Sequence, residues 1–364
     1  MKILVLANED EGLYQFRGEL LRELLKDHTV YTSVPYGKYI EDLQKMGCVV
    51  LNTDFDRHGV NPFADISLLL KYNHYVKTIK PDLVLTYTIK PNVYGGIVCG
   101  INGIPYFSNI TGLGTAVENP GVMQKITILL YKFGLRKATK VFFQNNENKE
   151  FMLKHKIVKD NYSVIPGSGV NLERFNLLPF PEGNTVEFAF ISRIMKQKGI
   201  EQFLEAAEQI KSKHPETVFH ICGYYDEDYE EMVTDFQKKG IVVYHGNLRD
   251  VREIHRIIQC TIHPTYYPEG LSNVLLESSA SGRAIITTNR SGCKEVVDDG
   301  INGYVVRAKD ANDLIEKIER FLSLSWDQRR NMGLAGRNKV EREFDRKIVI
   351  EKYLNSISEL NRMG

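Results

Sequence analysis

Short apolar runs alternate with stretches of helical periodicity along the whole chain. Runs of four to eight apolar residues between turn signals are typical of strands buried on both faces of a parallel sheet. We expect such strands at 2–7, 29–34, 48–51, 82–87, 105–108, 140–143, 186–191, 217–222, 241–244, 260–263, 284–287 and 304–306. Helical stretches such as 17–26 and 68–79 separate them. The alternation predicts an α/β fold with one doubly wound sheet in each half of the chain.

Chain length and a linker-like segment predict two domains. A chain of 364 residues is longer than one hydrophobic core usually organises. Segments 165–170 and 179–183 are rich in proline and glycine, as an interdomain linker should be. We therefore expect an N-terminal domain over 1–168, a C-terminal domain over 169–344, and a last helix at about 345–364.

The composition excludes several classes of protein. The chain has 43% hydrophobic and 26% charged residues and a formal net charge of +1, which fits a soluble globular protein without a field for nucleic acid. Its five cysteines form no Cys-x-x-Cys pair, which favours buried reduced thiols and a cytoplasmic location. The first apolar run is too short for a signal peptide, and no run approaches the roughly 20 residues of a membrane span.

The segment Pro-Glu-Gly-Leu-Ser-Asn-Val-Leu-Leu-Glu, 268–277, points most directly to function. Glu269 lies in a loop with Gly270, and Ser272 is a plausible N-cap of the helix that contains Glu277. The start of such a helix is a ready anion site, and the second carboxylate follows about 7–8 Å along the axis. A nucleotide-sugar needs this order of groups, because carboxylates accept hydrogen bonds from the diols that flank its diphosphate.

Two glutamates at this spacing also occur by chance on surface loops and helices. The surroundings favour a site, because 260–263 resembles a buried strand that leads into the loop and helix. Ligands of such strand–loop–helix units bind at the carboxyl ends of the strands.

This segment and the following 280–306 resemble the Glu-seven-Glu signature of retaining glycosyltransferases of family 4, which have the GT-B fold. The resemblance covers nearly the whole chain and is strongest over 186–306. It implies two Rossmann-like domains that face a central cleft, with the acceptor on the first and the nucleotide-sugar on the second. It also implies that the last helix crosses back to the first domain.

The resemblance assigns roles to the residues of the signature. Glu269 would hold a hydroxyl of the donor sugar and Glu277 the ribose. The backbone N–H groups of Gly270, Leu271 and Ser272 would bind phosphate.

A basic loop follows the strand at 186–191. Arg193, Lys196 and Lys198 place three cations in six residues, which can stabilise a diphosphate leaving group but can equally form a solvated basic turn. The family places an arginine and a lysine on the diphosphate at the spacing of Arg193 and Lys198, so we assign these two, with Glu269, to catalysis and leave Lys196 out.

Weaker candidates lie in other loops at strand ends. A single glycine, Gly12, follows the first strand, where the family uses glycine to let the backbone approach the donor. Tyr14 and Arg17 would then face the acceptor, or serve as ordinary helix residues. Thr111 stands where many family members have a histidine near the reacting sugar. The resemblance also gives modest support to Leu248 and Arg249 beside the nucleotide base.

No metal or other cofactor is expected. Asp-x-Asp triplets at 54–56 and 226–228 could hold a divalent ion in the other large glycosyltransferase fold, but acidic turns are common, and we interpret both as solvated loops. The histidines show no metal-ligand spacing.

The stretch 123–140 mixes large apolar residues with five cations, among them Lys132, Arg136 and Lys137. It fits a helix that lies on an anionic membrane as well as a core helix with snorkelling lysines, and both interpretations stay open.

The expected function is transfer of a hexose or N-acetylhexosamine from a UDP-sugar, with retention, to a polyprenyl-diphosphate-linked glycan in capsule or O-antigen synthesis. The enzyme would be cytoplasmic and peripheral on the inner face of the cell membrane. One alternative is another GT-B enzyme, such as a UDP-sugar epimerase or a sugar-phosphate synthase. The other is a non-catalytic sugar-nucleotide-binding protein.

Overall fold

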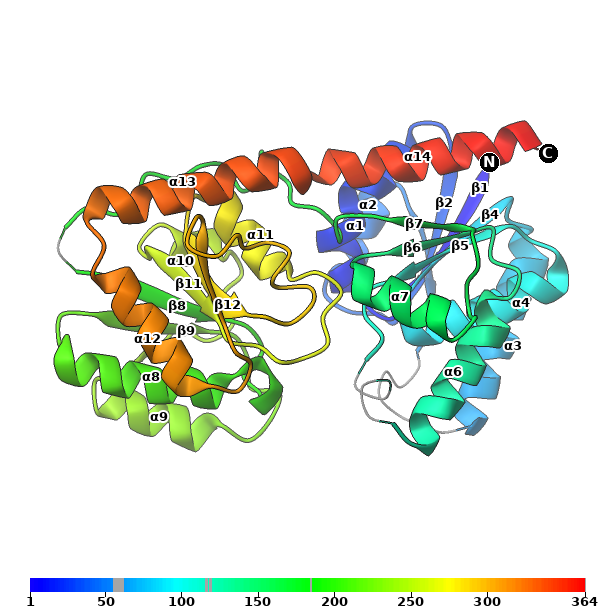
Figure 1. The fold of residues 1–364 in the computed structure, drawn as a ribbon. Coiled ribbons are helices and arrows are strands. Elements are labelled where there is room, and N and C mark those ends of the chain that lie inside the picture. Colours follow the sequence, from blue (N-terminus) through cyan, green and yellow to red (C-terminus); the bar gives the residue numbers. More distant parts are fainter. Residues whose placement is uncertain (55–61, 115–116, 118–119, 184, 364) are drawn as a thin grey trace. The chain divides into compact units, whose positions relative to one another are not determined.

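A computed structural model describes residues 1–54, 62–114, 117, 120–183 and 185–363. The chain forms two compact units (Figure 1). Unit 1 comprises Met1–Ser168, Glu269–Leu271 and Lys347–Gly364, and unit 2 comprises Gly169–Pro268 and Ser272–Arg346. Unit 1 therefore contains a three-residue loop and the last helix in addition to the N-terminal part of the chain.

Unit 1 is built on a seven-stranded sheet in which every pair of neighbouring strands is parallel. Its strands, in spatial order, are β3 (Val49–Asn52), β2 (Thr29–Val34), β1 (Lys2–Leu6), β4 (Leu83–Tyr87), β5 (Tyr106–Ile110), β6 (Lys140–Phe143) and β7 (Tyr162–Val164). The order reverses between β1 and β4, and ligands of such sheets bind beyond the carboxyl ends of the strands at this kind of switch point.

Helices cover both faces of this sheet. They are α1 (Asp10–Leu25), α2 (Ile40–Met46), α3 (Pro62–Ile79), the π-helix η1 (Pro91–Gly95), α4 (Gly96–Asn102), α6 (Val122–Leu135), α7 (Asn146–Lys154) and α14 (Arg346–Met363). Alternate residues of β1 enter different cores: Ile3 packs with α1, α2 and α14, whereas Leu4 packs with α3, α4, α6 and α7. This follows from the two-residue period of a strand.

Unit 2 has a six-stranded parallel sheet. Its strands, in spatial order, are β10 (Val243–Tyr244), β9 (Val218–Cys222), β8 (Glu187–Ile191), β11 (Cys260–His263), β12 (Ala284–Thr288) and β13 (Gly303–Val306). Its helices are η2 (Lys196–Lys198), α8 (Ile200–Lys213), α9 (Glu230–Lys238), α10 (Arg252–His255), α11 (Asn273–Ala280), α12 (Ala311–Leu322) and α13 (Trp326–Glu343).

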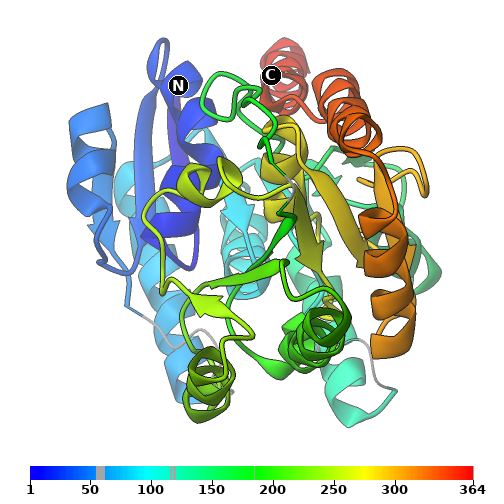
Figure 2. The same ribbon diagram turned by 90° about the vertical axis from the view of Figure 1, so that its left-hand side faces the viewer.

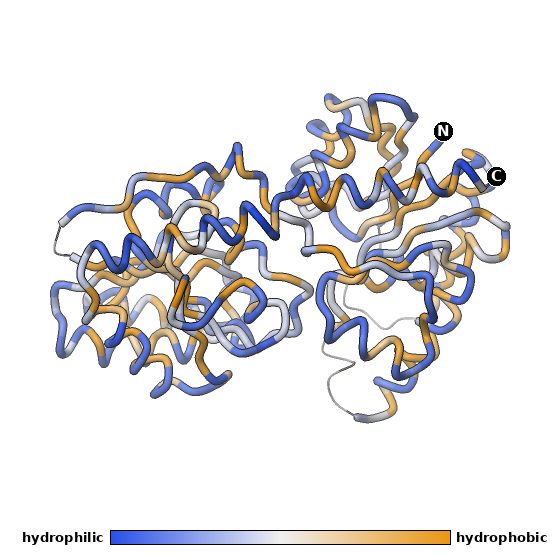
Figure 3. Tube along the Cα trace, turned by 45° about the horizontal axis from the view of Figure 1, so that its top comes forward, coloured by the Kyte–Doolittle hydropathy of each residue, from blue (hydrophilic) through white to orange (hydrophobic). Residues whose placement is uncertain are grey.

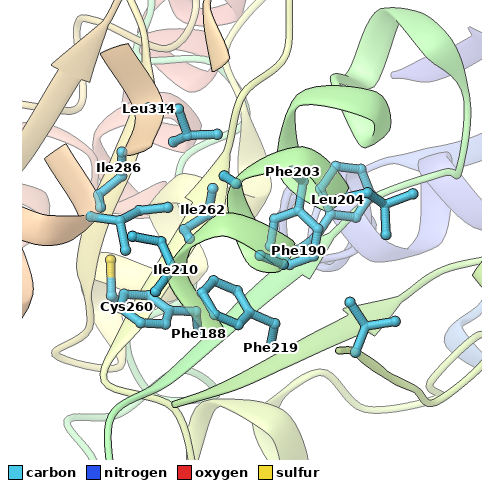
Figure 4. Close-up of a cluster of buried hydrophobic side chains, with 14 of the residues drawn as sticks. Phe188, Phe190, Phe203, Leu204, Ile210, Phe219, Cys260, Ile262, Ile286 and Leu314 are labelled. Carbon is cyan, nitrogen blue, oxygen red and sulfur yellow. The ribbon is translucent and has the colours of Figure 1, made fainter. Parts of the chain in front are cut away.

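Aromatic side chains fill the larger core of unit 2. Phe188 and Phe219, on neighbouring strands, stack with ring centroids 5.0 Å apart, and Phe203 of α8 meets Phe219 edge-on (Figure 4). Leu314 brings α12 to the same face, where α8 and α12 lie next to each other (Figure 2). The opposite face carries a smaller cluster that includes Ala189 and Ile254.

The predicted α/β class and the GT-B type of fold are confirmed, and so are the predicted strands, apart from small shifts at their ends. In Figure 3 the strands of both units are largely hydrophobic, whereas the helices alternate in colour as amphipathic helices do. The last helix, α14, packs Val349, Tyr353 and Ile357 into unit 1, at the four-residue spacing of one helix face.

Three elements differ from the expectation. Helix α3 begins at Pro62 instead of residue 68. Helix α1 begins at Asp10 instead of residue 17, because acidic residues suit the first turn of a helix and Glu9 before it is extended. Strand β7 was missed, since it is three residues long, lies at a sheet edge and is only half-buried.

All five cysteines are buried and free, as predicted. In the part of the chain that is described, no helix is both long and apolar enough to cross a lipid bilayer.

Candidate functional site

The signature segment forms the expected strand, loop and helix. Strand β11 is buried throughout, and Ser272 occupies the N-cap position of α11 with extended backbone angles. Its side chain does not cap the helix: the Ser272 hydroxyl lies 3.3 Å from Nε2 of His263. The N–H group of Ser272 donates to the carbonyl of Gly292 over 2.8 Å. The prediction that Ser272 offers this N–H to phosphate is therefore corrected, because a loop carbonyl already accepts it.

Glu277 lies within α11 with a half-buried side chain. Burial raises the pKa of its carboxyl from 4.5 to about 7, while the positive charges of Arg346 and Arg174 partly offset the shift. Asp250 adds a smaller contribution in the same direction as burial. Without a ligand, the ionised form of this carboxyl is destabilised by desolvation. A ligand that donates hydrogen bonds to the carboxylate would offset that cost.

Arg193 and Lys198 lie around one aromatic ring. Cζ of Arg193 is 5.5 Å and Nζ of Lys198 is 5.0 Å from the centroid of Tyr267. Lys198 is only 7% exposed, which is unusual for a lysine and indicates a built position rather than a solvated turn. Lys196 is exposed and pairs instead with Glu201, 3.4 Å away. The structure thus separates Lys196 from the two cations that were assigned to the site.

The second Asp-x-Asp triplet, 226–228, lies in an exposed loop, as expected, but two of its carboxylates have protein partners. Oδ2 of Asp226 accepts a hydrogen bond from Nη1 of Arg193 over 2.6 Å, and the Glu227 carboxylate accepts from the backbone N–H of Lys196 over 2.8 Å. Asp226 therefore holds the guanidinium that was assigned to the diphosphate.

The first triplet, at 54–56, extends outside the described residues, since only Asp54 is described. Among the residues that the structure does describe, no group of three histidine, cysteine, aspartate or glutamate side chains has the arrangement of a metal site.

Glu269, Gly270 and Leu271 belong to unit 1. A Cβ atom at Gly270 would clash with the carbonyl oxygen of Thr111 and with Oε1 of Gln144. Glycine is therefore required at this position for space, and the structure brings the predicted residues Thr111 and Gly270 together. Glu269 is half-buried at the start of this loop.

Two residues at the end of β6 contact this loop and were missed. The Nδ2 atom of Asn145 donates to the carbonyls of Glu269 and Gly270, over 3.1 and 2.5 Å. Gln144 donates from Nε2 to Oδ1 of Asn109 over 3.1 Å. Their signal in the sequence was available: two carboxamides directly follow a buried apolar run, at the edge of the sheet where ligands bind.

Gly12 and its neighbours lie in α1 rather than in a loop. Gly12 is in the first turn of that helix, where a Cβ atom would approach the flexible Glu9 carboxylate to 2.7 Å. Tyr14 stacks on Tyr39 with centroids 5.0 Å apart. Arg17 is only 6% exposed, with its guanidinium 5.0 Å from the centroid of Tyr87. The expectation of a glycine loop after β1 is thus wrong, and Arg17 presents little surface to an acceptor.

The other two predicted residues follow β10. Leu248 packs against the smaller core cluster of unit 2, which includes Cys222. Arg249 is exposed. The neighbouring His245 lies with Nε2 2.9 Å from Nδ1 of His220, and burial followed by this neighbour lowers the pKa of His245.

Helix α6 forms most of the stretch 123–140 and buries one face, as the core interpretation predicts. Thr127, Tyr131, Gly134 and Leu135 face the interior of unit 1. The opposite face carries large apolar residues with exposures between 46% and 75%: Val122, Met123, Ile126, Leu129 and Phe133. The helix is therefore a core helix whose outer face is also apolar.

Comparison with known proteins identifies the family. A model described as "Glycosyl transferase 4-like" matches residues 2–145, and a model described as "Glycosyl transferases group 1" matches residues 178–339. The chain belongs to the glycosyltransferases. The two matches fall in different halves of the chain, in the parts that form the two sheets.

Relatives of this glycosyltransferase include enzymes of bacterial glycan synthesis. It is 27% identical, over 97% of each chain, to N,N'-diacetylbacillosaminyl-diphospho-undecaprenol alpha-1,3-N-acetylgalactosaminyltransferase of Campylobacter jejuni. It is 27% identical, over 78% of this chain and 79% of the other, to UDP-Gal:alpha-D-GlcNAc-diphosphoundecaprenol alpha-1,3-galactosyltransferase of Escherichia coli. Its fold is similar to that of Anabaena HepE solved with UDP-glucose, with a TM-score of 0.82, 16% identity, and coverage of 99% and 100%.

Proposed function

We propose that this glycosyltransferase moves a hexose or N-acetylhexosamine from a UDP-sugar to a polyprenyl-diphosphate-linked glycan, with retention. The observation that carries the proposal is the pair of cations at Tyr267, in the same unit as the half-buried carboxyl of Glu277. A diphosphate requires the first feature and a ribose diol the second. The names of the two relatives support the acceptor class and an α linkage in the product.

Each residue has a role in this proposal. Unit 2 binds the donor, with Glu277 on the ribose and Arg193 and Lys198 on the diphosphate. The N–H groups of Gly270 and Leu271 contact phosphate, and Glu269 accepts a hydrogen bond from a hydroxyl of the donor sugar. Unit 1 otherwise serves the acceptor. The acceptor region ends at residue 168 and the donor region follows it. The last helix belongs again to the acceptor region.

The transfer exchanges one bond to the anomeric carbon for another. The acceptor hydroxyl attacks the anomeric carbon from the face on which UDP departs. The new bond to the acceptor oxygen therefore has the same orientation as the broken bond to the phosphate oxygen of UDP. The acceptor proton passes to the departing phosphate oxygen, and UDP leaves. Negative charge grows on UDP toward the transition state, where Arg193 and Lys198 stabilise it more than in the ground state.

The exposed apolar face of α6 supports binding to an anionic membrane. Helix α3 adds a similar stripe of Phe63, Ile66 and Leu70, and both helices pack against η1 and α4. Exposed Lys125 and Lys132 lie on α6 itself. Each basic residue near an anionic surface contributes about 1 kcal/mol, and apolar side chains that enter the interface add to this. We therefore assign this surface to the bilayer that carries a lipid-linked acceptor.

Vesicle co-sedimentation tests the membrane surface. Leu129→Gln with Phe133→Gln should release the protein from anionic vesicles while leaving transfer to a short water-soluble acceptor unchanged. Ile301→Gln, at a 63% exposed apolar residue of unit 2, is the matched control and should remain bound. Binding of the double variant at the wild-type level would place the membrane contact elsewhere.

A thermal-shift screen against UDP-Gal, UDP-Glc, UDP-GalNAc, UDP-GlcNAc and GDP-Man tests the donor class. We expect stabilisation by UDP-sugars and none by GDP-Man, followed by sugar transfer to a polyprenyl-diphosphate-linked saccharide. Product formation without a glycan acceptor would indicate an epimerase or synthase. Stabilisation by UDP without any turnover would indicate a binding protein.

A further inference from the structure

The side chain of Asn145 is fully engaged at the end of β6. It is 3% exposed and makes hydrogen bonds in two directions. Its Oδ1 accepts from the backbone N–H of Asn148 over 2.8 Å and caps helix α7. Its Nδ2 donates to the carbonyls of Glu269 and Gly270. One carboxamide therefore connects the backbone of Glu269 and Gly270 to the first turn of α7, both within unit 1.

The loop fits against the same strand ends without spare room. The carbonyl of Thr111 and Oε1 of Gln144 occupy the space where a side chain at residue 270 would lie. Gly270 is buried. Displacement of the loop toward these strands would produce a clash, and displacement away from them would break the bonds to Asn145.

A chain of carboxamides supports this arrangement from behind. Gln144 donates to Asn109, and Nδ2 of Asn109 donates to the hydroxyl of Tyr353 on α14 over 2.7 Å. Asn92 donates from Nδ2 to the carbonyl of Asn109 over 2.8 Å. All four side chains are buried, so each lost partner would leave an unsatisfied polar group.

We infer that Asn145 is a positioning residue for transfer, which holds the main chain of Glu269 and Gly270 so that the Glu269 carboxylate meets the donor sugar. The inference rests on the role of Glu269 in the proposed function. Asn145 touches no reacting atom itself. Its effect is on geometry, and a misplacement of about 1 Å in a reacting group can lower the rate about 10²-fold.

Asn145→Asp separates the two roles of this residue, which are to cap α7 and to donate hydrogen bonds to the loop carbonyls. Aspartate is an equally good N-cap and keeps the bond from the Asn148 N–H, but it cannot donate to the two loop carbonyls. Asn145→Ser also keeps a capping oxygen and adds no charge, but its short side chain lacks the amide NH2 group that donates to both carbonyls. The control is Met152→Ala, which removes a fully buried core side chain from the same helix, α7, without changing the capping residue.

The experiment measures kcat for sugar transfer, the inhibition constant of UMP, and Tm. UMP lacks both the sugar and the second phosphate, so its binding does not depend on where the Glu269 carboxylate lies. We expect both Asn145 variants to lose about 10²-fold in kcat, with UMP inhibition unchanged within about twofold. Met152→Ala should lower Tm and leave kcat, measured below its Tm, at the wild-type level.

Wild-type kcat in either Asn145 variant would overturn the inference, as would a parallel loss of kcat and UMP binding. Failure of both variants to fold would overturn it too, because both keep the cap. The proposed function fails by a different result: a wild-type enzyme that neither transfers sugar from a UDP-sugar nor binds UMP.

Discussion

The residues assigned to the donor in unit 2 and those that hold the Glu269–Leu271 loop in unit 1 differ in whether they carry charge. Those assigned to the donor in unit 2 are ionisable: Arg193 and Lys198 at Tyr267, and Glu277 with a pKa raised to about 7. Those that hold the Glu269–Leu271 loop in unit 1 are neutral carboxamides, Gln144 and Asn145.

The difference reflects what each group acts on. A charged side chain is effective where charge changes during the reaction, as on the phosphate that leaves. A carboxamide satisfies backbone carbonyls in a buried place without the desolvation cost of an ion. We therefore expect substitutions in unit 2 to respond to ligand charge and pH, and substitutions at Asn145 to respond to neither.

The largest expected effect is that of the cations. Arg193→Ala and Lys198→Met should each lower kcat about 10²–10³-fold, because the lost interaction strengthens as the phosphate gains charge. Steady-state kinetics with a UDP-sugar measure this. Lys196→Ala is the control, since Lys196 is exposed and pairs with Glu201, and its kcat should stay within about threefold of wild type. A rise in KM alone in the two site variants would mean that the cations only bind the ground state.

The next effect is that of Glu277 on nucleotide binding. Glu277→Ala should weaken UDP by about 1.5–3 kcal/mol, the range for a hydrogen bond to a charged group. Calorimetric titration of UDP at pH 8, where the wild-type carboxyl is ionised, gives the value. An unchanged UDP affinity in a folded variant would remove Glu277 from the donor site.

A third effect tests the raised pKa of Glu277 in the protein without ligand. The folded state binds a proton more tightly than the unfolded state, so this group favours folding below pH 4.5 and loses that contribution as pH rises through about 7. Glu277→Gln should therefore be more stable than wild type at pH 8, with a gap that narrows toward pH 5. Denaturant titrations at both pH values measure it, and a gap independent of pH would contradict the assigned cause.

The sequence was sufficient for most of the fold, because apolar periodicity and turn residues are local signals. The strand β11 and the helix that contains Glu277 could be placed from them. Edge strand β7 could not, since three half-buried residues carry too little of this pattern.

Contacts that depend on tertiary structure were beyond sequence reasoning. Asp226 lies 33 residues from Arg193 in the chain, and its pairing follows only from the order of β8 and β9. Asn145 lies 125 residues from Gly270. Ser272 was a correct N-cap position, but the loop at Gly292 that takes its N–H belongs to a different strand end. A motif indicates which residues to consider, whereas packing decides which of their groups remain for a ligand.

The smallest expected effect is that of chelation. Because the cations of unit 2 are assigned to the diphosphate, EDTA should leave kcat within about twofold of its untreated value. Assays before and after EDTA, with manganese added back, measure this. Loss of activity that manganese restores would assign the diphosphate to a metal ion instead.

The most direct test of the central claim is a calorimetric comparison of UDP, UMP and GDP on the wild-type protein. If the two cations of unit 2 hold the diphosphate, UDP should bind about tenfold or more tightly than UMP, and if its base site accepts uracil, UDP should also bind more tightly than GDP. Equal affinity for UDP and GDP would contradict the donor assignment, and equal affinity for UDP and UMP would contradict the role of Arg193 and Lys198.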